Sequence, residues 1–319
     1  MKLRVLFLKK VHILLFICSF LFLLILLSFY IKSGNKNATV ETFYTINNER
    51  LIKSDFTGDD KKDILYADTN SSKYFLSIIS NNKIYTLNPS KSNYTLGNFY
   101  NYCPMNVYST DINSDGTKEL ILQSMDRGLA LQHIFMWNGK KFKDKFSSYS
   151  NIVGVDYENN GNLALISGNY SSGKLIWLHK AFYKDKISKL KNYNNLCTSD
   201  ISEFIKYIEN LQLRQKYSLS GILSPMIDGK YLTILDKLSN SNSIYKFTYG
   251  NFFRNQTNEN RKDTDYTFIL NFSIMSDSNY DTPNDYMTLT LKLKPIGDNF
   301  KIYSIDKGKL SPSNTVSLR

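Results

Sequence analysis

A polar loop after residue 110 carries oxygen-bearing side chains at alternate positions and a glycine where the chain must turn. In chain order, positions 1, 3, 5, 6, 7 and 9 of this loop are Asp111, Asn113, Asp115, Gly116, Thr117 and Glu119. Calcium is a hard cation that binds roughly six to eight oxygens at about 2.3–2.6 Å. Alternate side chains on a tight loop, with the backbone carbonyl of Thr117, deliver such oxygens from one side. The spacing therefore predicts a structural Ca2+ site that ties strand ends together.

Two other loops repeat this pattern with departures. The first loop offers Asp55, Thr57, Asp59, the backbone carbonyl of Lys61, and Asp63; the third offers Asp156, Glu158 and Asn160. The three loops start 56 and 45 residues apart. The first loop has Asp60 at the turning position, which tolerates the left-handed conformation less well than glycine. The third has Ala164 at position 9 and lacks one ligand. The alternative is that all three are Asx-type turns that link strands without metal.

The residues after the second loop exclude a helical EF-hand. That motif needs a bidentate Glu at position 12 and a following helix. Position 12 is Leu122, inside the apolar run LILQ, so the loop leads into a strand. Strand-like runs between turn residues are Ile64–Ala67, Tyr74–Ile79, Leu120–Gln123, Ile134–Trp137 and Leu163–Ser167. Asn138-Gly139 predicts a two-residue hairpin turn. The repeating loop-and-strand pattern indicates one β-sheet blade per repeat.

The segments DFTGDDKKDIL and DINSDGTKELIL resemble the calcium loops of FG-GAP/VCBS repeats, the family that builds integrin-α-like β-propellers. The resemblance covers residues of about 45–170. It implies propeller-like sheets with calcium at the blade loops, and ligand or partner binding as the general role. The Phe-Gly and Gly-Ala-Pro pieces that name the family are absent. The family's usual propeller has about seven blades, whereas this stretch is long enough for three or four.

The chain changes character near Cys197. Apolar residues at helical spacing follow: Ile201, Phe204, Ile205, Ile208 and Leu211. Asp200 and Glu203 resemble a capping box, and a second short helix is expected around residues 231–238. Four strand-like runs then complete a small α+β domain: Ile244–Phe253, Tyr266–Ile274, Tyr286–Leu293 and Phe300–Ile305. Its ending GDNFKIYSIDKG is weakly similar to the cone-shaped ketosteroid-isomerase and nuclear-transport-factor-like fold.

An apolar stretch from Val11 to Ile31 precedes these parts. At about 1.5 Å per residue, roughly 21 helical residues reach about 31 Å, the thickness of a bilayer's hydrocarbon core. Four basic residues lie before the stretch and one lies shortly after it: Lys2, Arg4, Lys9, Lys10 and Lys32. The positive-inside rule then predicts a cytoplasmic N-terminus. The alternatives are a cleaved signal peptide and a lipoprotein modified at Cys18.

The predicted fold is an N-terminal transmembrane helix, then all-β propeller-like repeats, then the α+β domain. The predicted parts are a cytoplasmic tail at 1–10, a signal anchor at 11–31, a linker at 32–40, a β-repeat domain at 41–190, an α+β domain at 198–310 and a tail at 311–319. This places a single-pass protein in the cell membrane with most of the chain outside the cytoplasm. The net charge is +12, of which five positives flank the anchor. The remainder favours weak attraction to anionic surfaces, and the location excludes nucleic acid.

No catalytic constellation stands out. The chain has no H-E-x-x-H, G-x-S-x-G or C-x-x-C motif, and its three histidines are His12, His133 and His179. The segment Gly168–Lys174 (GNYSSGK) matches most of a P-loop, but Leu175 stands where Ser or Thr is needed, so a hairpin is predicted. Cys103 and Cys197 are the two cysteines outside the anchor, and their pairing stays open.

These observations predict a membrane-anchored binding or assembly module without catalytic residues or an organic cofactor. Its expected partner is a wall polymer, a glycan or an envelope protein. One alternative is a hydrolase that acts on an envelope polymer with Asp277 and Asp281 as acid and base, in an acidic loop that also holds Asp285. Another is binding of a small ligand in the cone of the C-terminal domain.

Overall fold

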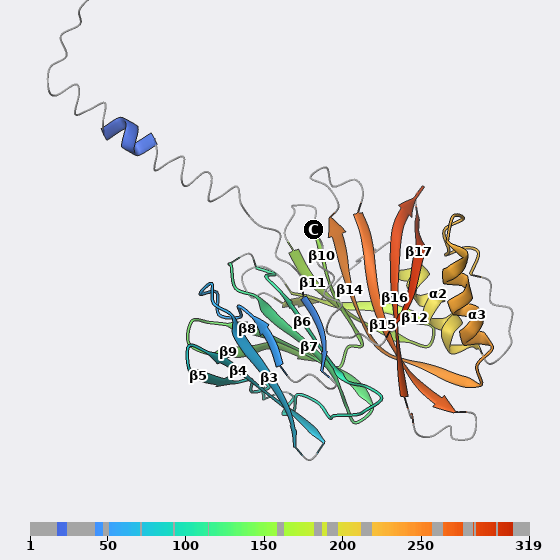
Figure 1. The fold of residues 1–319 in the computed structure, drawn as a ribbon, viewed down its shortest axis with the longest axis horizontal. Helices are drawn as coiled ribbons and strands as arrows, with labels where there is room; N and C mark the ends of the chain where they lie inside the picture. The colour runs from blue at the N-terminus through green and yellow to red at the C-terminus, as the bar shows by residue number, and fades with distance from the viewer. Residues whose placement is uncertain are drawn as a thin grey trace, which may run out of the picture. The chain divides into compact units, whose positions relative to one another are not determined.

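The computed structural model describes residues 18–23, 42–46, 51–70, 72–91, 93–113, 115–157, 163–181, 187–189, 197–211, 219–256, 264–276, 283, 285–297 and 299–308. The chain divides into two compact units, Met1–Val40 and Glu41–Arg319. Residues 18–23 of the first unit are helical. The labelled strands and helices of Figure 1 belong to the second unit.

The predicted transmembrane helix is not found. No helix within the described residues is long and apolar enough to cross a membrane. Within the span 11–31, the structure describes residues 18–23, which are helical. The rest of that span, the tail at 1–10 and the linker at 32–40 lie outside the described residues. The predictions of a membrane anchor and of a single-pass membrane location are therefore corrected.

The first two repeats each form an antiparallel four-stranded meander. The first meander has the strand order β2-β3-β4-β5, with bounds Leu51–Ser54, Asp63–Asn70, Lys73–Ser80 and Lys83–Thr86. The second has the order β6-β7-β8-β9, with bounds Met105–Thr110, Glu119–Asp126, Leu129–Trp137 and Phe142–Ser148. Strand β1 (Thr42–Ile46) adds to its β6 edge. Each acidic loop joins the first strand of its meander to the second.

The third repeat continues directly into the C-terminal strands. Its meander β10-β11-β12-β13 has the bounds Ile152–Tyr157, Leu163–Ser171, Lys174–Ala181 and Ile187–Lys189. Strand β10 then pairs in parallel with β14. An antiparallel meander β14-β15-β16-β17 follows, with bounds Ser243–Gln256, Thr264–Ser276, Asp285–Ile296 and Asn299–Gly308. One eight-stranded sheet therefore spans both sides of the boundary expected at residues 190–198.

The predicted propeller is wrong, although the strand pattern behind it holds. The five-, eight- and four-stranded sheets formed by the described residues are open, and they do not close into a propeller. The reason lies in the third meander, whose first strand β10 has its outer edge paired with β14. The repeat is thereby built into a mixed sheet with the C-terminal strands. The described part of the second unit is therefore an open-sheet, mostly β fold with the helices α2 and α3.

Side-chain burial follows how many faces of a strand are covered. Every residue of β7 is buried, because the second meander packs on both of its faces. One core cluster joins it to the first meander and includes Leu65, Leu76, Val107, Leu122 and Phe135. A second cluster joins it to the third meander and includes Tyr108, Ile121, Ile134, Val155 and Leu165. In β3, buried and more exposed residues alternate at first, as expected for a sheet with one covered face.

Two helices cover the largest core. Helix α2 (Thr198–Glu209) packs against β12 and β14, and α3 (Gly229–Ser239) packs against β17 (Figure 1). The apolar residues expected on one face of α2 are fully buried: Ile201, Phe204, Ile205 and Ile208. The expected capping box is not used, because the N-cap residue is Cys197, without a side-chain cap. Asp228 caps α3 by accepting the backbone N–H of Lys230.

Candidate functional site

The second acidic loop is closed by its own carboxylates. Asp111 accepts the backbone N–H groups of Asp115 at 3.1 Å and Gly116 at 2.9 Å. Glu119, at position 9, accepts the backbone N–H of Ile112 at 2.6 Å. Asp111 and Glu119 are buried. The carboxylates therefore point into the loop, where a cation is expected, and not toward solvent.

The remaining predicted ligands of this loop also take part in its hydrogen bonds. Asn113 donates its side-chain N–H to Asp115 at 2.9 Å. Asp115 in turn accepts the backbone N–H of Thr117 at 2.8 Å. All five predicted ligand residues of the second loop are thus held around one turn.

The first loop has the same hydrogen-bond pattern at equivalent positions. Asp55 accepts the backbone N–H groups of Asp59 at 3.3 Å and Asp60 at 2.8 Å. Asp63 accepts the backbone N–H of Phe56 at 2.8 Å. Position 6 has a positive φ in both loops, 63° at Asp60 and 88° at Gly116. Aspartate therefore adopts the conformation that glycine adopts in the second loop.

Thr57 and Lys61 complete the first loop. The Thr57 hydroxyl donates to Asp63 at 3.1 Å, and the backbone N–H of Lys61 donates to Asp59 at 3.0 Å. The two loops lie side by side, since a Cβ added to Gly58 would come within 2.8 Å of the Thr117 hydroxyl. The equivalent ends of the first two meanders therefore meet.

The third loop differs from the other two. Asp156 is buried and accepts hydrogen bonds from the Tyr266 hydroxyl at 2.9 Å and from the Arg254 guanidinium at 3.3 Å. Both donors come from the C-terminal strands β14 and β15. Glu158 and Asn160 lie outside the described residues. Asp156 therefore joins the third repeat to the C-terminal strands.

The donor chemistry of the second loop suits Ca2+. Among the described residues, no group of three or more His, Cys, Asp or Glu side chains is already arranged to hold a metal ion. Burial, reinforced by the charges of Asp115 and Asp111, raises the pKa of Glu119 to about 8 despite its hydrogen bond from Ile112. A divalent cation among these carboxylates would relieve that repulsion. A carboxylate oxygen that accepts one N–H also keeps a further lone pair for a cation.

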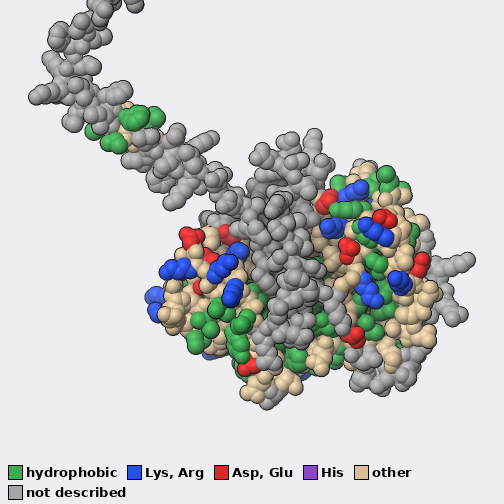
Figure 2. Space-filling view, viewed as in Figure 1, with side chains coloured by type: hydrophobic (Ala, Val, Ile, Leu, Met, Phe, Trp, Pro, Cys, Tyr) green, Lys and Arg blue, Asp and Glu red, His purple; other side chains and the backbone are tan. Residues whose placement is uncertain are grey.

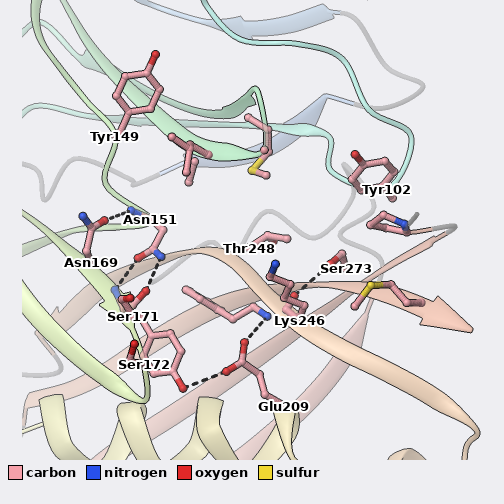
Figure 3. A pocket seen from close by; sticks show the side chains of 18 of the residues that line it. Tyr102, Tyr149, Asn151, Asn169, Ser171, Ser172, Glu209, Lys246, Thr248 and Ser273 are labelled. Atoms are coloured by element: carbon pink, nitrogen blue, oxygen red, sulfur yellow. Dashed lines mark hydrogen bonds between the residues drawn. The ribbon is translucent and has the colours of Figure 1, made fainter. Parts of the chain in front are cut away.

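A cavity of about 760 Å³ lies where the second meander, the third meander and the C-terminal strands meet. Its volume is in the range of small-molecule sites, roughly 300–1,000 Å³. Polar and aromatic side chains from all three parts line it (Figure 3), among them Tyr102, Tyr149, Asn169, Glu209, Lys246 and Thr248. None of these residues was predicted as a site residue from the sequence.

The cavity occupies a place that β10 leaves open in the eight-stranded sheet. Strand β10 begins at Ile152, which pairs with Gly168 of β11 and with Gly250 of β14. The end of β11 at residues 169–171 and the part of β14 at residues 246–248 extend beyond that point. None of the described strands lies between these two segments, and both line the cavity.

Two side chains replace the missing strand pairing. Asn151 donates its side-chain N–H to the Tyr170 carbonyl at 2.9 Å and accepts the Tyr170 N–H at 2.7 Å. Glu209, the last residue of α2, accepts the backbone N–H of Phe247 at 3.0 Å and the Tyr170 hydroxyl at 3.2 Å. Figure 3 shows these bonds at the wall of the cavity. They hold the Glu209 carboxylate at the cavity and pair backbone groups of Tyr170 and Phe247 at the strand edges.

Glu209 is the acidic group of this cavity. Burial raises its pKa, while the Phe247 N–H, the Tyr170 hydroxyl and the Lys246 charge lower it by less. Burial and the Glu209 carboxylate likewise raise the pKa of the Tyr170 hydroxyl. Lys246 is exposed at the rim. The cavity thus combines one half-buried carboxyl group with one exposed ammonium group.

Two tyrosine rings lie across the cavity from Glu209 (Figure 3). Tyr149 is 43% exposed, and its hydroxyl donates to Asp126 at 2.9 Å. This hydrogen bond is the main reason why the pKa of Tyr149 is raised. Tyr102 stacks on Tyr100 with ring centroids 5.1 Å apart. Each ring is therefore held in place by a neighbour while it borders the cavity.

One segment singled out in the sequence lies at this cavity, although its pattern predicted only a hairpin. The segment GNYSSGK forms the predicted hairpin between β11 and β12, with positive φ at Ser172 and Gly173. This hairpin lines the cavity with Asn169, Ser171 and Ser172. Nothing in the spacing of the tyrosines or of Glu209 distinguished them from core residues.

The other sequence candidates that the structure describes are not among the residues that line this cavity. Asp277 and Asp281 lie outside the described residues, and Asp285 begins β16. His133 is fully buried, with its Nδ1 2.8 Å from Asp144. Cys103 and Cys197 form no disulfide with each other, and they belong to different core clusters.

Comparison with solved structures finds matches to this chain, whereas comparison by sequence finds none. No family model and no curated protein matches the chain. Five chains of solved structures match. One is an Ntf2-like protein involved in plasmid conjugation, which is 10% identical, covers 77% of this chain and 76% of its own, and has a TM-score of 0.23. At that score the match does not define the fold of this chain. The resemblance to FG-GAP/VCBS repeats is therefore not supported by any family model.

Proposed function

We propose that this protein is a non-catalytic binding module whose ligand occupies the cavity at residues 169–171 and 246–248. The observation that carries the proposal is the cavity itself, which is large and lined by polar groups held in fixed positions. Large, mostly pre-formed cavities with a few convergent polar groups are the usual sites of ligand binding.

The chemistry of the cavity favours binding over acid–base catalysis. Hydrolysis of a glycosidic polymer commonly uses two carboxyl groups that flank the bond. Glu209 is the only Asp or Glu among the described residues that line this cavity. Its two oxygens already accept hydrogen bonds from Phe247 and Tyr170, which suits a fixed recognition group.

We further propose that Ca2+ stabilises the scaffold at the first two acidic loops. Asp111, Asp115 and Glu119 would hold one ion, and Asp55 and Asp63 would contribute to another. The equivalent hydrogen bonds of the two loops support this assignment. The melting temperature with and without calcium tests it.

On the face shown in Figure 2, Lys and Arg side chains are interspersed with Asp and Glu. They are not gathered there into the basic stripe that marks nucleic-acid-binding proteins. The positive charge of the described side chains is therefore not concentrated on this face. A glycan or another polar polymer segment remains the partner class that we propose.

The binding role can be tested without knowing the natural ligand. A mixture of small polar fragments is screened by ligand-observed NMR against the protein and two variants. Ser171→Trp places a bulky ring at the cavity, whereas Lys174→Trp alters the paired residue across the same hairpin, outside the cavity lining. We expect fragments to bind the parent protein and Lys174→Trp, and binding to be lost in Ser171→Trp. Fragments that bind all three proteins alike, or none, would contradict a ligand site in this cavity.

A further inference from the structure

We infer that the ligand of this cavity is a neutral saccharide, bound with a sugar ring against Tyr149 and its hydroxyl groups against Glu209 and the β11–β12 hairpin. This inference rests on the proposed binding function and names its ligand class. It is drawn from the arrangement of aromatic faces and hydrogen-bonding groups in one cavity.

The aromatic side of the cavity suits a sugar ring. Tyr149 leaves 43% of its surface exposed and lines the cavity. Its hydroxyl donates a hydrogen bond to Asp126, which fixes the ring at the cavity. An aromatic ring offers an apolar face, and the C–H groups on one side of a pyranose can pack on such a face. Tyr102, which stacks on Tyr100, borders the same space.

The opposite side supplies acceptors and donors for hydroxyl groups. Each oxygen of Glu209 accepts one hydrogen bond from the protein, and a carboxylate oxygen can accept more than one. Asn169 accepts the Asn151 backbone N–H with its side-chain oxygen at 2.9 Å. That bond turns the Asn169 amide so that its NH2 group remains to donate. Ser171 and Ser172 add exposed hydroxyls at the hairpin.

Other ligand classes fit this lining less well. A wholly apolar ligand would remove Glu209 and Asn169 from water without returning hydrogen bonds, which costs free energy. A polyanion would meet the Glu209 carboxylate and the C-terminal end of α2, where the helix dipole disfavours negative charge. Lys246 is the one basic residue among the described residues that line the cavity. A neutral ligand rich in hydroxyl groups can satisfy both sides.

The inference is tested by calorimetric titration of the full chain with three neutral trisaccharides: cellotriose, maltotriose and tri-N-acetylchitotriose. Trialanine and inorganic triphosphate serve as peptide and anion probes. The variants are Tyr149→Ala, which removes the ring, and Tyr149→Phe, which keeps the ring and removes the hydroxyl. Tyr94→Ala is the matched control, because Tyr94 is 82% exposed and is not part of the lining.

We expect at least one trisaccharide to bind and Tyr149→Ala to weaken its binding about tenfold or more. Tyr149→Phe should change the affinity by no more than about threefold, and Tyr94→Ala should leave it unchanged. Both Tyr149 variants lose the hydrogen bond to Asp126, so their difference in affinity reports the contribution of the ring. The inference is overturned if trialanine or triphosphate binds in place of the saccharides. It is also overturned if Tyr149→Ala binds a trisaccharide as tightly as the parent protein.

Failure of the saccharides alone is distinguishable from failure of the binding function. If fragments bind in the Ser171-dependent manner described above but no trisaccharide binds, the cavity is a ligand site and the saccharide inference is wrong. If neither fragments nor saccharides bind, both proposals are wrong.

Discussion

Asp55 and Asp111 each shape a loop by accepting backbone N–H groups from residues four and five positions later. A short carboxylate that bonds to its own backbone favours turns over helix or strand. The same residue type has a different use at Asp156, where Tyr266 and Arg254 are the donors. At the residue scale, chemical type sets what a side chain can bind, and its surroundings decide which partner it finds.

Calcium dependence is the prediction at this scale. We expect millimolar Ca2+ to raise the melting temperature by about 5–10 °C over a chelator, the shift for ligand at roughly 100 times its Kd. Asp111→Ala combined with Asp115→Ala should remove the part of that shift that comes from the second loop, because this loop then loses two of its carboxylates. Thermal unfolding followed by circular dichroism measures it.

The matched control replaces two carboxylates outside the loops, Asp236→Ala with Asp306→Ala, and should retain the shift. Equal melting temperatures of the parent protein in calcium and in chelator would mean that the loops are closed by their own hydrogen bonds without metal.

At the element scale, the cavity depends on where strands start and stop. Strands β11 and β14 extend beyond the level at which β10 begins. Asn151 bridges this gap through hydrogen bonds to the backbone N–H and carbonyl of Tyr170. Glu209 performs the same task for Phe247 from the end of α2. A backbone group left unpaired in a partly buried place is costly, so these two side chains hold the cavity in shape.

We predict that Asn151→Ala lowers the free energy of unfolding by about 2 kcal/mol, since two hydrogen bonds of roughly 1 kcal/mol each are lost. Urea denaturation measures the change. Asn88→Ala is the control, because Asn88 is exposed and its single side-chain bond is 3.5 Å long. Its effect should stay within about 0.5 kcal/mol. If both variants lose the same stability, Asn151 does not support the sheet as described.

At the scale of the whole molecule, the third repeat and the C-terminal strands form one sheet and one core. The largest core cluster combines Ile166 and Trp177 of the third meander with Phe204 of α2 and Leu291 of β16. The division expected at residues 190–198 remains a prediction, but the shared core argues against two parts that fold separately.

We therefore predict that residues 42–189 and 197–308 do not fold when expressed apart. Each fragment would expose its half of the shared core to water, and contiguous apolar surface of that kind leads to aggregation. Residues 42–308 expressed together should unfold in one cooperative transition. A cooperative transition in the isolated 42–189 fragment would show that the repeats are an independent domain.

Local features of this protein could be predicted from its sequence because their causes lie within a few residues. The buried face of α2, the hairpin at Ser172-Gly173 and the loop-then-strand pattern all follow from side-chain spacing and turn residues. The turn at Asn138-Gly139 shows the limit, since the hairpin forms but β8 and β9 are joined by residues 138–141.

What the tertiary structure alone decided involves partners that are far apart in the chain. Hydropathy predicted a membrane-spanning helix, whereas no helix among the described residues is long and apolar enough to cross a membrane. Pairing of β10 with β14 joins residues about a hundred positions apart. It places the third meander in one open sheet with the C-terminal strands. The cavity lies beside this pairing. The pairing could not be predicted from sequence, because a strand edge is chemically uniform along the backbone and only packing selects its neighbour.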